Sequence, residues 1–303
     1  MTTADPADWT HAVEMTGVGR RYGDFWALRD LTLDLPAGSI TALVGPNGAG
    51  KTTLLNLLVG LLPTSEGRLR VLGDEPSSRP ASLMRVGFVA QDCPLYKDFT
   101  VADLLRFGRS MNPHWDSELA RDRLVAAEVP MNRKAGRLSG GQRAQVALAI
   151  AVSKRPRVLL LDEPLAALDP VARRTFLQNL IASAAATEMT VILSSHLIGE
   201  LARVCDHLVV IRNGRLALSG PLDELLYEHR WVTGSVVELS GTPDGVDVIA
   251  DDGDERHRRL LLRSRGPLLN PSLVQTPVGL EELVLAYLES PLQTTETSAE
   301  AMP

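Results

Sequence analysis

The segment from Gly45 to Thr53, Gly-Pro-Asn-Gly-Ala-Gly-Lys-Thr-Thr, constrains the fold of this chain more than any other. It matches G-x-x-x-x-G-K-[ST], a glycine-rich loop whose backbone N–H groups surround phosphate. Residues 40–44 before it predict a short buried strand, and residues 53–58 after it predict the start of a helix. In that context the pattern forms an anion site, because the N-terminus of the helix adds partial positive charge.

In loops of this kind the lysine reaches the outer phosphates and the next hydroxyl binds Mg²⁺, which assigns these roles to Lys51 and Thr52. The loop predicts a nucleotide site and leaves the reaction open. We expect the whole loop to contact nucleotide: Gly45, Pro46, Asn47, Gly48, Ala49, Gly50, Lys51, Thr52 and Thr53.

Composition argues against several other functions. The net charge is −6 and no tract is rich in lysine or arginine, so neither nucleic acid nor an anionic membrane surface is an expected partner. Cys93 and Cys205 belong to no C-x-x-C pair, which predicts reduced thiols rather than a metal site or a disulfide. No signal peptide and no apolar run of roughly 18 residues is present, so we expect any membrane span to belong to another chain.

Strand and helix patterns alternate along the first part of the chain, which predicts an α/β fold with a mainly parallel sheet. Residues 158–162 form an apolar run ended by an acid, as expected of a central parallel strand covered on both faces. Residues 100–127 have a mostly helical pattern that Asn112–Pro113 interrupts. Residues 207–215 predict a hairpin with an Asn-Gly turn.

The pattern of apolar and polar residues changes near residue 230, so we expect the chain to divide into several segments. These are a flexible leader (1–12), a nucleotide-binding domain (13–230) with a helical part at about 92–155, a small C-terminal extension (231–290) and a disordered tail (291–303). In the extension we expect strands at 236–239, 246–250 and 260–263, a solvated charged loop at 251–259 and an amphipathic helix at 279–288.

Two longer motifs identify a family. Leu138–Gln142, Leu-Ser-Gly-Gly-Gln, is the signature of the ATP-binding cassette (ABC) ATPases. Val158–Pro164 resembles their second nucleotide motif, a hydrophobic strand ending in Asp-Glu, and Ala167–Asp169 resembles their D-loop.

Three single residues fit the same family. Gln91, His196 and Tyr22 stand where the Q-loop glutamine, the switch histidine and the adenine-stacking aromatic should be. Order and spacing match from about Val13 to Leu225, so the chain is identified as a member of the ABC ATPases. The resemblance implies a P-loop NTPase fold with an antiparallel β subdomain, a helical subdomain and a small C-terminal α+β extension.

The resemblance also implies roles for individual residues. Asp162 would hold Mg²⁺ with Thr52 and Gln91, and Glu163 would orient and polarise the attacking water. General-base action is worth about 10²–10⁴-fold in rate. His196 and Gln91 would contact the γ-phosphate and its water. The expected catalytic residues are Glu163, His196, Gln91 and Lys51.

The signature opens a helix and forms a second anion site. In this family two cassettes pair head to tail, and each signature completes the nucleotide site of the other subunit. The resemblance therefore implies a second ATPase subunit, identical or different, and two ATP molecules at the interface. The nucleotide contacts expected besides the loop are Tyr22, Ser139, Gly140, Gly141, Gln142 and Asp169.

One cassette without spans implies a separate membrane permease, with the chain held at the cytoplasmic face of the membrane. Pro94–Tyr96 and Phe99–Val101 resemble the surface that receives a coupling helix of the permease. Gly279–Leu283 resembles the C-terminal helix of drug-resistance-type exporter ATPases, so we expect an ATPase that powers export. An importer subunit and a soluble ABC ATPase outside transport remain the alternatives, and the sequence leaves the substrate open.

One departure from the family pattern is visible. Where the family usually has a Gln-Arg pair after the signature, this chain has Ala144–Gln145. Because the signature itself is intact, we expect catalysis to survive, and only the packing or charge of that helix to differ.

Overall fold

The computed structural model describes residues 9–166, 168–235, 239, 246–253, 257–264 and 273–290. The chain divides into two compact units, Met1–Asp223 and Glu224–Pro303. This division falls inside a helix, α8 (Leu222–Glu228), and the domain boundaries predicted above stay predictions. Among the described residues, no helix is both long and apolar enough to cross a membrane.

A six-stranded sheet forms the centre of the first unit. Its strands lie in the order β5 (Val86–Val89), β6 (Val158–Leu161), β7 (Thr190–Ser194), β3 (Ile40–Val44), β8 (His207–Arg212) and β9 (Arg215–Pro221). All neighbours are parallel except β8 and β9, which form the predicted hairpin. Asn213 and Gly214 both have positive φ in its turn, as an Asn-Gly turn of this kind requires. The mainly parallel sheet confirms the predicted fold class.

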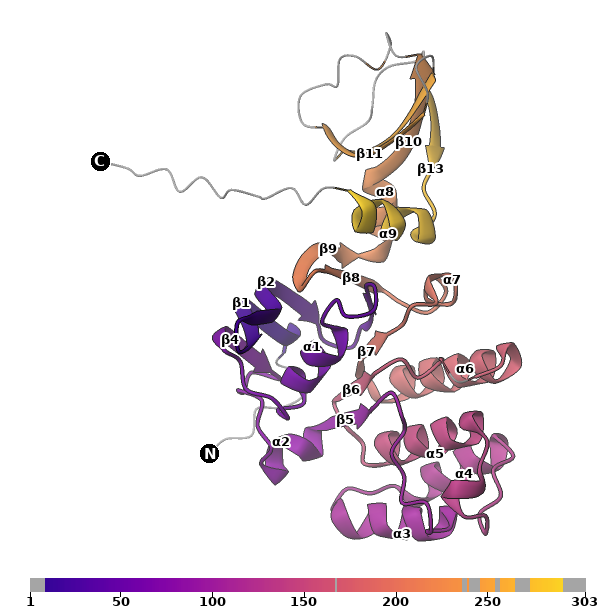
Figure 1. Ribbon diagram of the computed structural model, residues 1–303. Coiled ribbons are helices and arrows are strands. Elements are labelled where there is room, and N and C mark those ends of the chain that lie inside the picture. Colours follow the sequence, from indigo (N-terminus) through magenta and orange to yellow (C-terminus); the bar gives the residue numbers. More distant parts are fainter. Residues whose placement is uncertain are drawn as a thin grey trace. The chain divides into compact units, whose positions relative to one another are not determined.

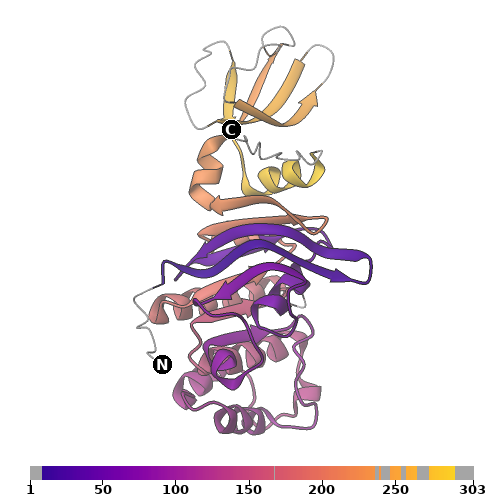
Figure 2. The ribbon, with the colours of Figure 1, turned by 90° about the vertical axis from the view of Figure 1, so that its left-hand side faces the viewer.

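The N-terminal strands of the same unit form a second sheet (Figures 1 and 2). It is antiparallel, in the order β2 (Phe25–Pro36), β1 (His11–Tyr22) and β4 (Glu66–Val71). Its inward residues share one core cluster with β3 and the helix after the glycine loop, α1 (Lys51–Leu58). Strand β1 begins at His11, inside the predicted leader, because Ala12 is fully buried in this cluster. Residues 1–8 lie outside the described residues.

Helices α3 (Val101–Met111), α4 (Ser117–Ala126) and α5 (Gly140–Ser153) lie together in Figure 1, away from β1, β2 and β4. They bury a small apolar core of their own, which includes Leu104, Leu124 and Val146. The break between α3 and α4 confirms the interruption predicted at Asn112–Pro113. The remaining helices of this unit are α2 (Pro80–Arg85), which the sequence did not predict, α6 (Pro170–Thr187) and α7 (Ile198–Leu201).

The second unit contains an antiparallel sheet in the order β11 (Val246–Gly253), β12 (His257–Ser264), β10 (His229–Ser235) and β13 (Val274–Pro277), together with α9 (Leu280–Glu289). The predicted strands near 246–250 and 260–263 and the predicted helix are confirmed. Strands β10 and β13 were not predicted. Of the strand expected at 236–239, only Leu239 is described, and it lies in a turn.

The prediction of a solvated loop at 251–259 is wrong for its two ends. Residues 251–253 continue β11 and residues 257–259 begin β12, and residues 254–256 lie outside the described residues. The guanidinium of Arg259 lies 4.0 Å from the centre of the Trp231 ring and pairs with Glu282, so this charge has partners within the unit. The predicted tail, 291–303, also lies outside the described residues.

Both cysteines are free and buried. Burial raises the pKa of Cys205 to about 12 and also raises the pKa of Cys93. Both thiols are therefore held in the protonated, unreactive form, in line with the reduced thiols expected from the sequence.

Candidate nucleotide site

The glycine-rich loop joins β3 to α1, and close packing at two of its glycines excludes a side chain. A Cβ atom on Gly45 would lie 2.2 Å from the carbonyl oxygen of Ile211 in β8. Gly50 has a φ of 106°, and a Cβ there would lie 2.6 Å from the carbonyl oxygen of Ala27. The loop is thus clamped between β8 and β2, and its backbone can approach a ligand because it carries so little side-chain bulk.

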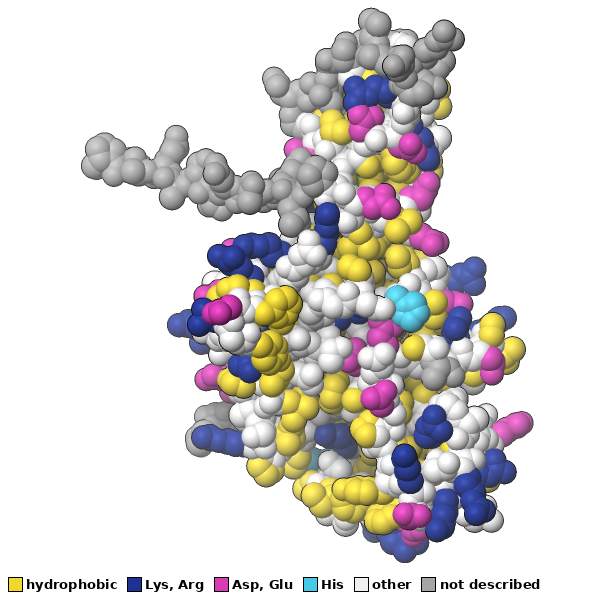
Figure 3. Space-filling model, viewed as in Figure 1, with side chains coloured by type: hydrophobic (Ala, Val, Ile, Leu, Met, Phe, Trp, Pro, Cys, Tyr) yellow, Lys and Arg dark blue, Asp and Glu magenta, His cyan; other side chains and the backbone are white. Residues whose placement is uncertain are grey.

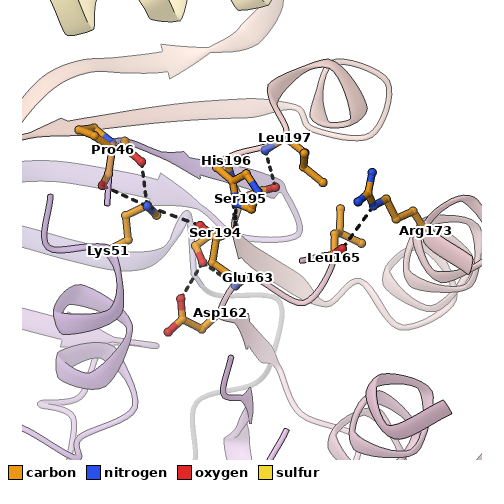
Figure 4. Close-up of polar contacts among 11 residues, drawn as sticks. Pro46, Lys51, Asp162, Glu163, Leu165, Arg173, Ser194, Ser195, His196 and Leu197 are labelled. Atoms are coloured by element: carbon orange, nitrogen blue, oxygen red, sulfur yellow. Dashed lines mark hydrogen bonds and ion pairs between the residues drawn. The ribbon is translucent and has the colours of Figure 1, made fainter. Parts of the chain in front are cut away.

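Lys51 is the first residue of α1, and its ammonium group is almost fully buried. Nζ donates to the carbonyl oxygens of Gly45 at 2.7 Å and Pro46 at 3.3 Å, and it lies 3.5 Å from Oε1 of Glu163 (Figure 4). A buried ammonium group needs such partners, because desolvation penalises an unpaired charge. Lys51 of the loop and Glu163 after β6 therefore form an ion pair within a single subunit.

Asp162 and Glu163 follow β6 directly and are 1% and 8% exposed. Glu163 has a φ of 46°, a left-handed conformation that costs about 1–3 kcal/mol in a residue other than glycine. Its Oε2 lies 2.7 Å from Nδ1 of His196 and accepts the backbone N–H of that residue at 3.3 Å. Because a carboxylate can only accept, Nδ1 of His196 donates to it and Nε2 is left for a ligand.

A cavity of about 710 Å³ gathers these groups. Among the described residues it is lined by the loop and by aromatic and polar side chains from four other segments: Tyr22, Phe25, Ala27, Gly45, Pro46, Asn47, Gly48, Gly50, Lys51, Thr52, Thr53, Gln91, Glu163 and His196. Every catalytic residue predicted from the sequence lies on its wall. Ala49, predicted as a loop contact, is buried beside the cavity rather than on its lining.

Phe25, which belongs to none of the predicted motifs, lies opposite Tyr22 across the β1–β2 hairpin. Tyr22 is 44% exposed and Phe25 is 66% exposed, so two aromatic rings are offered to the cavity. The guanidinium of Arg20 lies 4.7 Å from the centre of the Tyr22 ring. The two-residue turn between the rings was the available signal, since it makes them cross-strand neighbours.

The signature residues are placed elsewhere. Ser139 caps α5 in a capping box: its Oγ accepts the N–H of Gln142 at 3.2 Å, and Oε1 of Gln142 accepts the N–H of Ser139 at 3.2 Å. Gly140 and Gly141 form the first turn of that helix, and Asp169 caps α6 by accepting the N–H groups of Val171 and Ala172. None of these signature residues, nor Asp169, is among the described residues that line the cavity.

The departure from the family pattern is accommodated by packing. Ala144 is buried on α5, where a longer side chain would have to displace its neighbours. Arg143, one residue earlier, donates to the carbonyl oxygen of Leu138 at 2.9 Å and so holds the residue before the signature serine.

The oxygen groups near the loop fit a small hard cation. Thr52 and Gln91 offer a hydroxyl and an amide oxygen on the cavity wall. Asp162, the residue before Glu163, offers a buried carboxylate but is not among the described residues that line the cavity. Oxygen ligands of this kind, few in number and combined with phosphate, are what Mg²⁺ prefers. Among the described residues no group of three or more His, Cys, Asp or Glu side chains could hold a metal by itself.

Comparison with known proteins decides the family. A family model described as "ABC transporter" matches residues 28–166. The sulfate/thiosulfate import ATP-binding protein CysA of Synechocystis sp. is 32% identical over 255 residues, which cover 81% of this chain and 71% of that protein. The Nod factor export ATP-binding protein I of Sinorhizobium fredii is 34% identical over 301 residues, which cover 90% and 85%. The chain belongs to the ABC transporter family.

Within that family it is an ATP-binding subunit, an ATPase coupled to transport. The solved structure of cbiO1 from Clostridium perfringens, described as part of the ABC transporter complex cbiONQ, matches this ABC subunit with a TM-score of 0.62 and 27% identity over 73% of this chain and 92% of that one. The ABC subunit spans 61% to 71% of the length of the seven import proteins compared with it.

Proposed function

We propose that this ABC subunit binds Mg²⁺ and ATP in the cavity beside the glycine-rich loop and hydrolyses ATP when two subunits pair head to tail. The observation that carries the proposal is the separation of two half-sites. Lys51, Glu163 and His196 meet in the cavity, whereas Ser139 and its helix N-terminus lie outside it. The signature of a second subunit would supply the missing half.

The chemistry follows from the arrangement of the acids. Oε1 of Glu163 is buried and has no hydrogen-bond partner among the described residues, while Oε2 is held by His196. Oε1 lies 3.5 Å from Nζ of Lys51 without a hydrogen bond, and once Lys51 binds phosphate it can accept a proton from a water that attacks the γ-phosphate. Lys51 exchanges loop carbonyls for phosphate oxygens, which are charged and therefore stronger acceptors. Thr52, Gln91 and Asp162 would hold Mg²⁺, which would neutralise charge that develops on the phosphates.

An exposed aromatic cluster supports a membrane permease as the second partner. The rings of Tyr96, Phe99 and Phe107 lie 5.2 to 6.4 Å apart between their centres, and all three are exposed. Figure 3 shows hydrophobic side chains gathered at the lower edge of the molecule, where α3 lies in Figure 1. Exposed apolar patches mark partner surfaces. Binding there would hold the subunit at the cytoplasmic face of the membrane.

Import is the direction that most relatives support. Of eight relatives compared, seven are named as import proteins, for sulfate/thiosulfate or Fe(3+) ions. These names favour the importer alternative over the export predicted from the sequence.

Export remains a second candidate because of one observation. The match to the Nod factor export protein covers 90% of this chain, more than any of the seven import proteins covers. Reconstituting the subunit with its permease and measuring on which side of the vesicle solute accumulates with ATP separates the two directions.

The test of the proposed function is Glu163→Gln. The amide removes the proton acceptor but keeps the size of the side chain, so we expect ATP binding to be retained and turnover to fall by about 10²–10⁴-fold. The ATP-bound protein should accumulate as a dimer in size-exclusion chromatography, and wild-type protein with ADP should not. Hydrolysis near the wild-type rate in the variant would refute the role given to Glu163.

A further inference from the structure

Ser194 ends β7 and lies next to the two acids at the end of β6. The strands are parallel, with Leu161 opposite Leu193, so the next residues along the two strands, Asp162 and Ser194, meet at the carboxyl edge of the sheet. Ser194 is fully buried. Figure 4 shows it against Asp162 and Glu163. It belongs to none of the sequence motifs described above.

One hydroxyl serves both acids. Oγ of Ser194 donates to Oδ1 of Asp162 at 2.8 Å and accepts the backbone N–H of Glu163 at 2.8 Å. A hydroxyl has a single proton, so the bond to the carboxylate fixes the rotor and leaves a lone pair for the amide. Both bonds are buried, where water does not compete and a charge-assisted bond is strong.

Each bond fixes something that hydrolysis needs. The bond to Oδ1 sets the plane of the Asp162 carboxylate and thereby the direction of its second oxygen. The bond to the N–H of Glu163 anchors a residue whose φ is 46°, a conformation that persists only when its surroundings hold it. The orientation of both acids therefore depends on the same side chain.

We infer that Ser194 is a positioning residue for ATP hydrolysis, which orients Asp162 toward Mg²⁺ and holds the backbone of Glu163 under the attacking water. The inference rests on the proposed function and deepens it. It assigns Ser194 no contact with nucleotide, because Ser194 is absent from the described lining of the cavity.

The test is Ser194→Ala in the full chain, with nucleotide binding measured by a fluorescent ATP analogue both in EDTA and across a Mg²⁺ titration. Loss of a group that orients a metal ligand usually costs 10–100-fold in metal affinity or activity. In Ser194→Ala we expect the Mg²⁺ concentration that gives half-maximal enhancement of nucleotide binding to rise by about 10- to 100-fold. We expect kcat for ATP hydrolysis to fall by a similar factor. Nucleotide affinity in EDTA should stay unchanged. Ser194→Thr, which keeps the hydroxyl, should return the Mg²⁺ concentration for half-maximal binding to the wild-type value.

Ser195→Ala is the matched control. Ser195 is equally buried, but its Oγ accepts the N–H of Leu197 and contacts neither acid. Losing this hydroxyl should leave the Mg²⁺ requirement unchanged, whatever it does to stability.

Two outcomes would overturn the inference. One is a wild-type Mg²⁺ requirement and kcat in Ser194→Ala. The other is an equal loss of nucleotide affinity with and without Mg²⁺ that Ser195→Ala reproduces, since this would make Ser194 a packing residue only. Neither outcome touches the proposed function, which fails separately if the wild-type chain hydrolyses no ATP or if Glu163→Gln leaves hydrolysis intact.

Discussion

Gly45 and Gly48 belong to one loop but are glycines for different physical reasons. Gly45 is crowded, since a Cβ there would meet the Ile211 carbonyl at 2.2 Å. Gly48 has a φ of 80° with open space around it. The first position excludes any side chain by packing, and the second only disfavours one by backbone conformation.

This difference predicts different costs for alanine at the two positions. Gly45→Ala should lower the free energy of unfolding by at least about 2 kcal/mol, because β8 and its backbone carbonyl cannot move aside cheaply. Gly48→Ala should cost about 1–2 kcal/mol through strain alone. Urea unfolding of the two variants side by side checks the order, and equal costs would contradict the crowding argument.

Some residues of the candidate site could be predicted from the sequence and others could not. Lys51, Glu163 and His196 were predictable because each lies in or beside a motif read along the chain. Phe25 and Ser194 were missed because their roles depend on strand register: the pairing of β1 with β2 and of β6 with β7 brings them to the site. For β6 and β7, which are parallel and far apart in the chain, register is fixed by tertiary packing that local patterns do not report. In the β1–β2 hairpin the turn fixes it, and this was the unused signal for Phe25.

At the level of elements, a buried polar network joins β10 to α9 in the second unit. His229 is fully buried, its Nδ1 donates to the carbonyl oxygen of Leu225 at 2.6 Å, and its Nε2 accepts from Tyr287 Oη at 2.9 Å. Beside it Arg263 pairs with Glu228. Burial lowers the pKa of His229, and the bond to Leu225 only partly offsets this shift.

The lowered pKa predicts that the second unit loses stability in acid. The unfolded chain binds a proton at His229 near pH 6.5, whereas the folded chain binds it only at lower pH. The contribution of His229 is therefore complete above pH 6.5 and is lost as the pH falls through the folded pKa, with a slope of at most about 1.4 kcal/mol per pH unit. Hydrogen exchange of peptides from β10 and α9 in the full chain, between pH 7.5 and 5, measures it.

Two histidine variants test this prediction, one at His229 and one at a histidine in the first unit. His229→Gln keeps polar groups near both partners without a titrating ring, so the acid sensitivity of β10 and α9 should shrink. His114→Gln changes an exposed side chain of the first unit and should leave the acid sensitivity of β10 and α9 unchanged. Identical exchange profiles for wild type and His229→Gln would contradict the assignment.

The second unit also shows where element prediction fails. Strand β10 was missed because it begins with His229 and Arg230 directly after α8 and lacks the alternation of apolar and polar residues that marks a strand. The charged stretch 251–259 suggested a loop, yet Arg258 and Asp251 pair across β11 and β12. Cross-strand ion pairs let a charged sequence form a hairpin, and the sequence alone does not show that opposite charges seven positions apart will pair.

At the level of the whole molecule, the two half-sites predict a specific complementation. If two subunits pair head to tail as proposed, a mixed dimer of one Lys51→Ala chain and one Ser139→Ala chain has both residues intact in one site and neither in the other. Each variant alone should be nearly inactive, because every site then lacks one of the two groups. Mixing them should restore part of the ATPase activity.

The measurement is the ATPase rate at constant total protein and varied ratio, with a maximum expected at equal amounts. A double variant, Lys51→Ala with Ser139→Ala, mixed with either single variant should give no gain, because no site then contains both groups. A flat response across all ratios would exclude sharing of sites between subunits.

The strand order of the large sheet also affects how the chain is made. Strand β3 lies between β7 and β8, both of which follow it far along the chain. At 5–20 residues per second, the roughly 150 residues between Val44 and Thr190 take about 7–30 seconds to synthesise. During that time the apolar segment 40–44 has emerged without either of its final neighbours. Nascent chains of this protein therefore present an unpaired apolar strand of the kind that chaperones hold, and a ribosome that stalls before β7 leaves it unpaired.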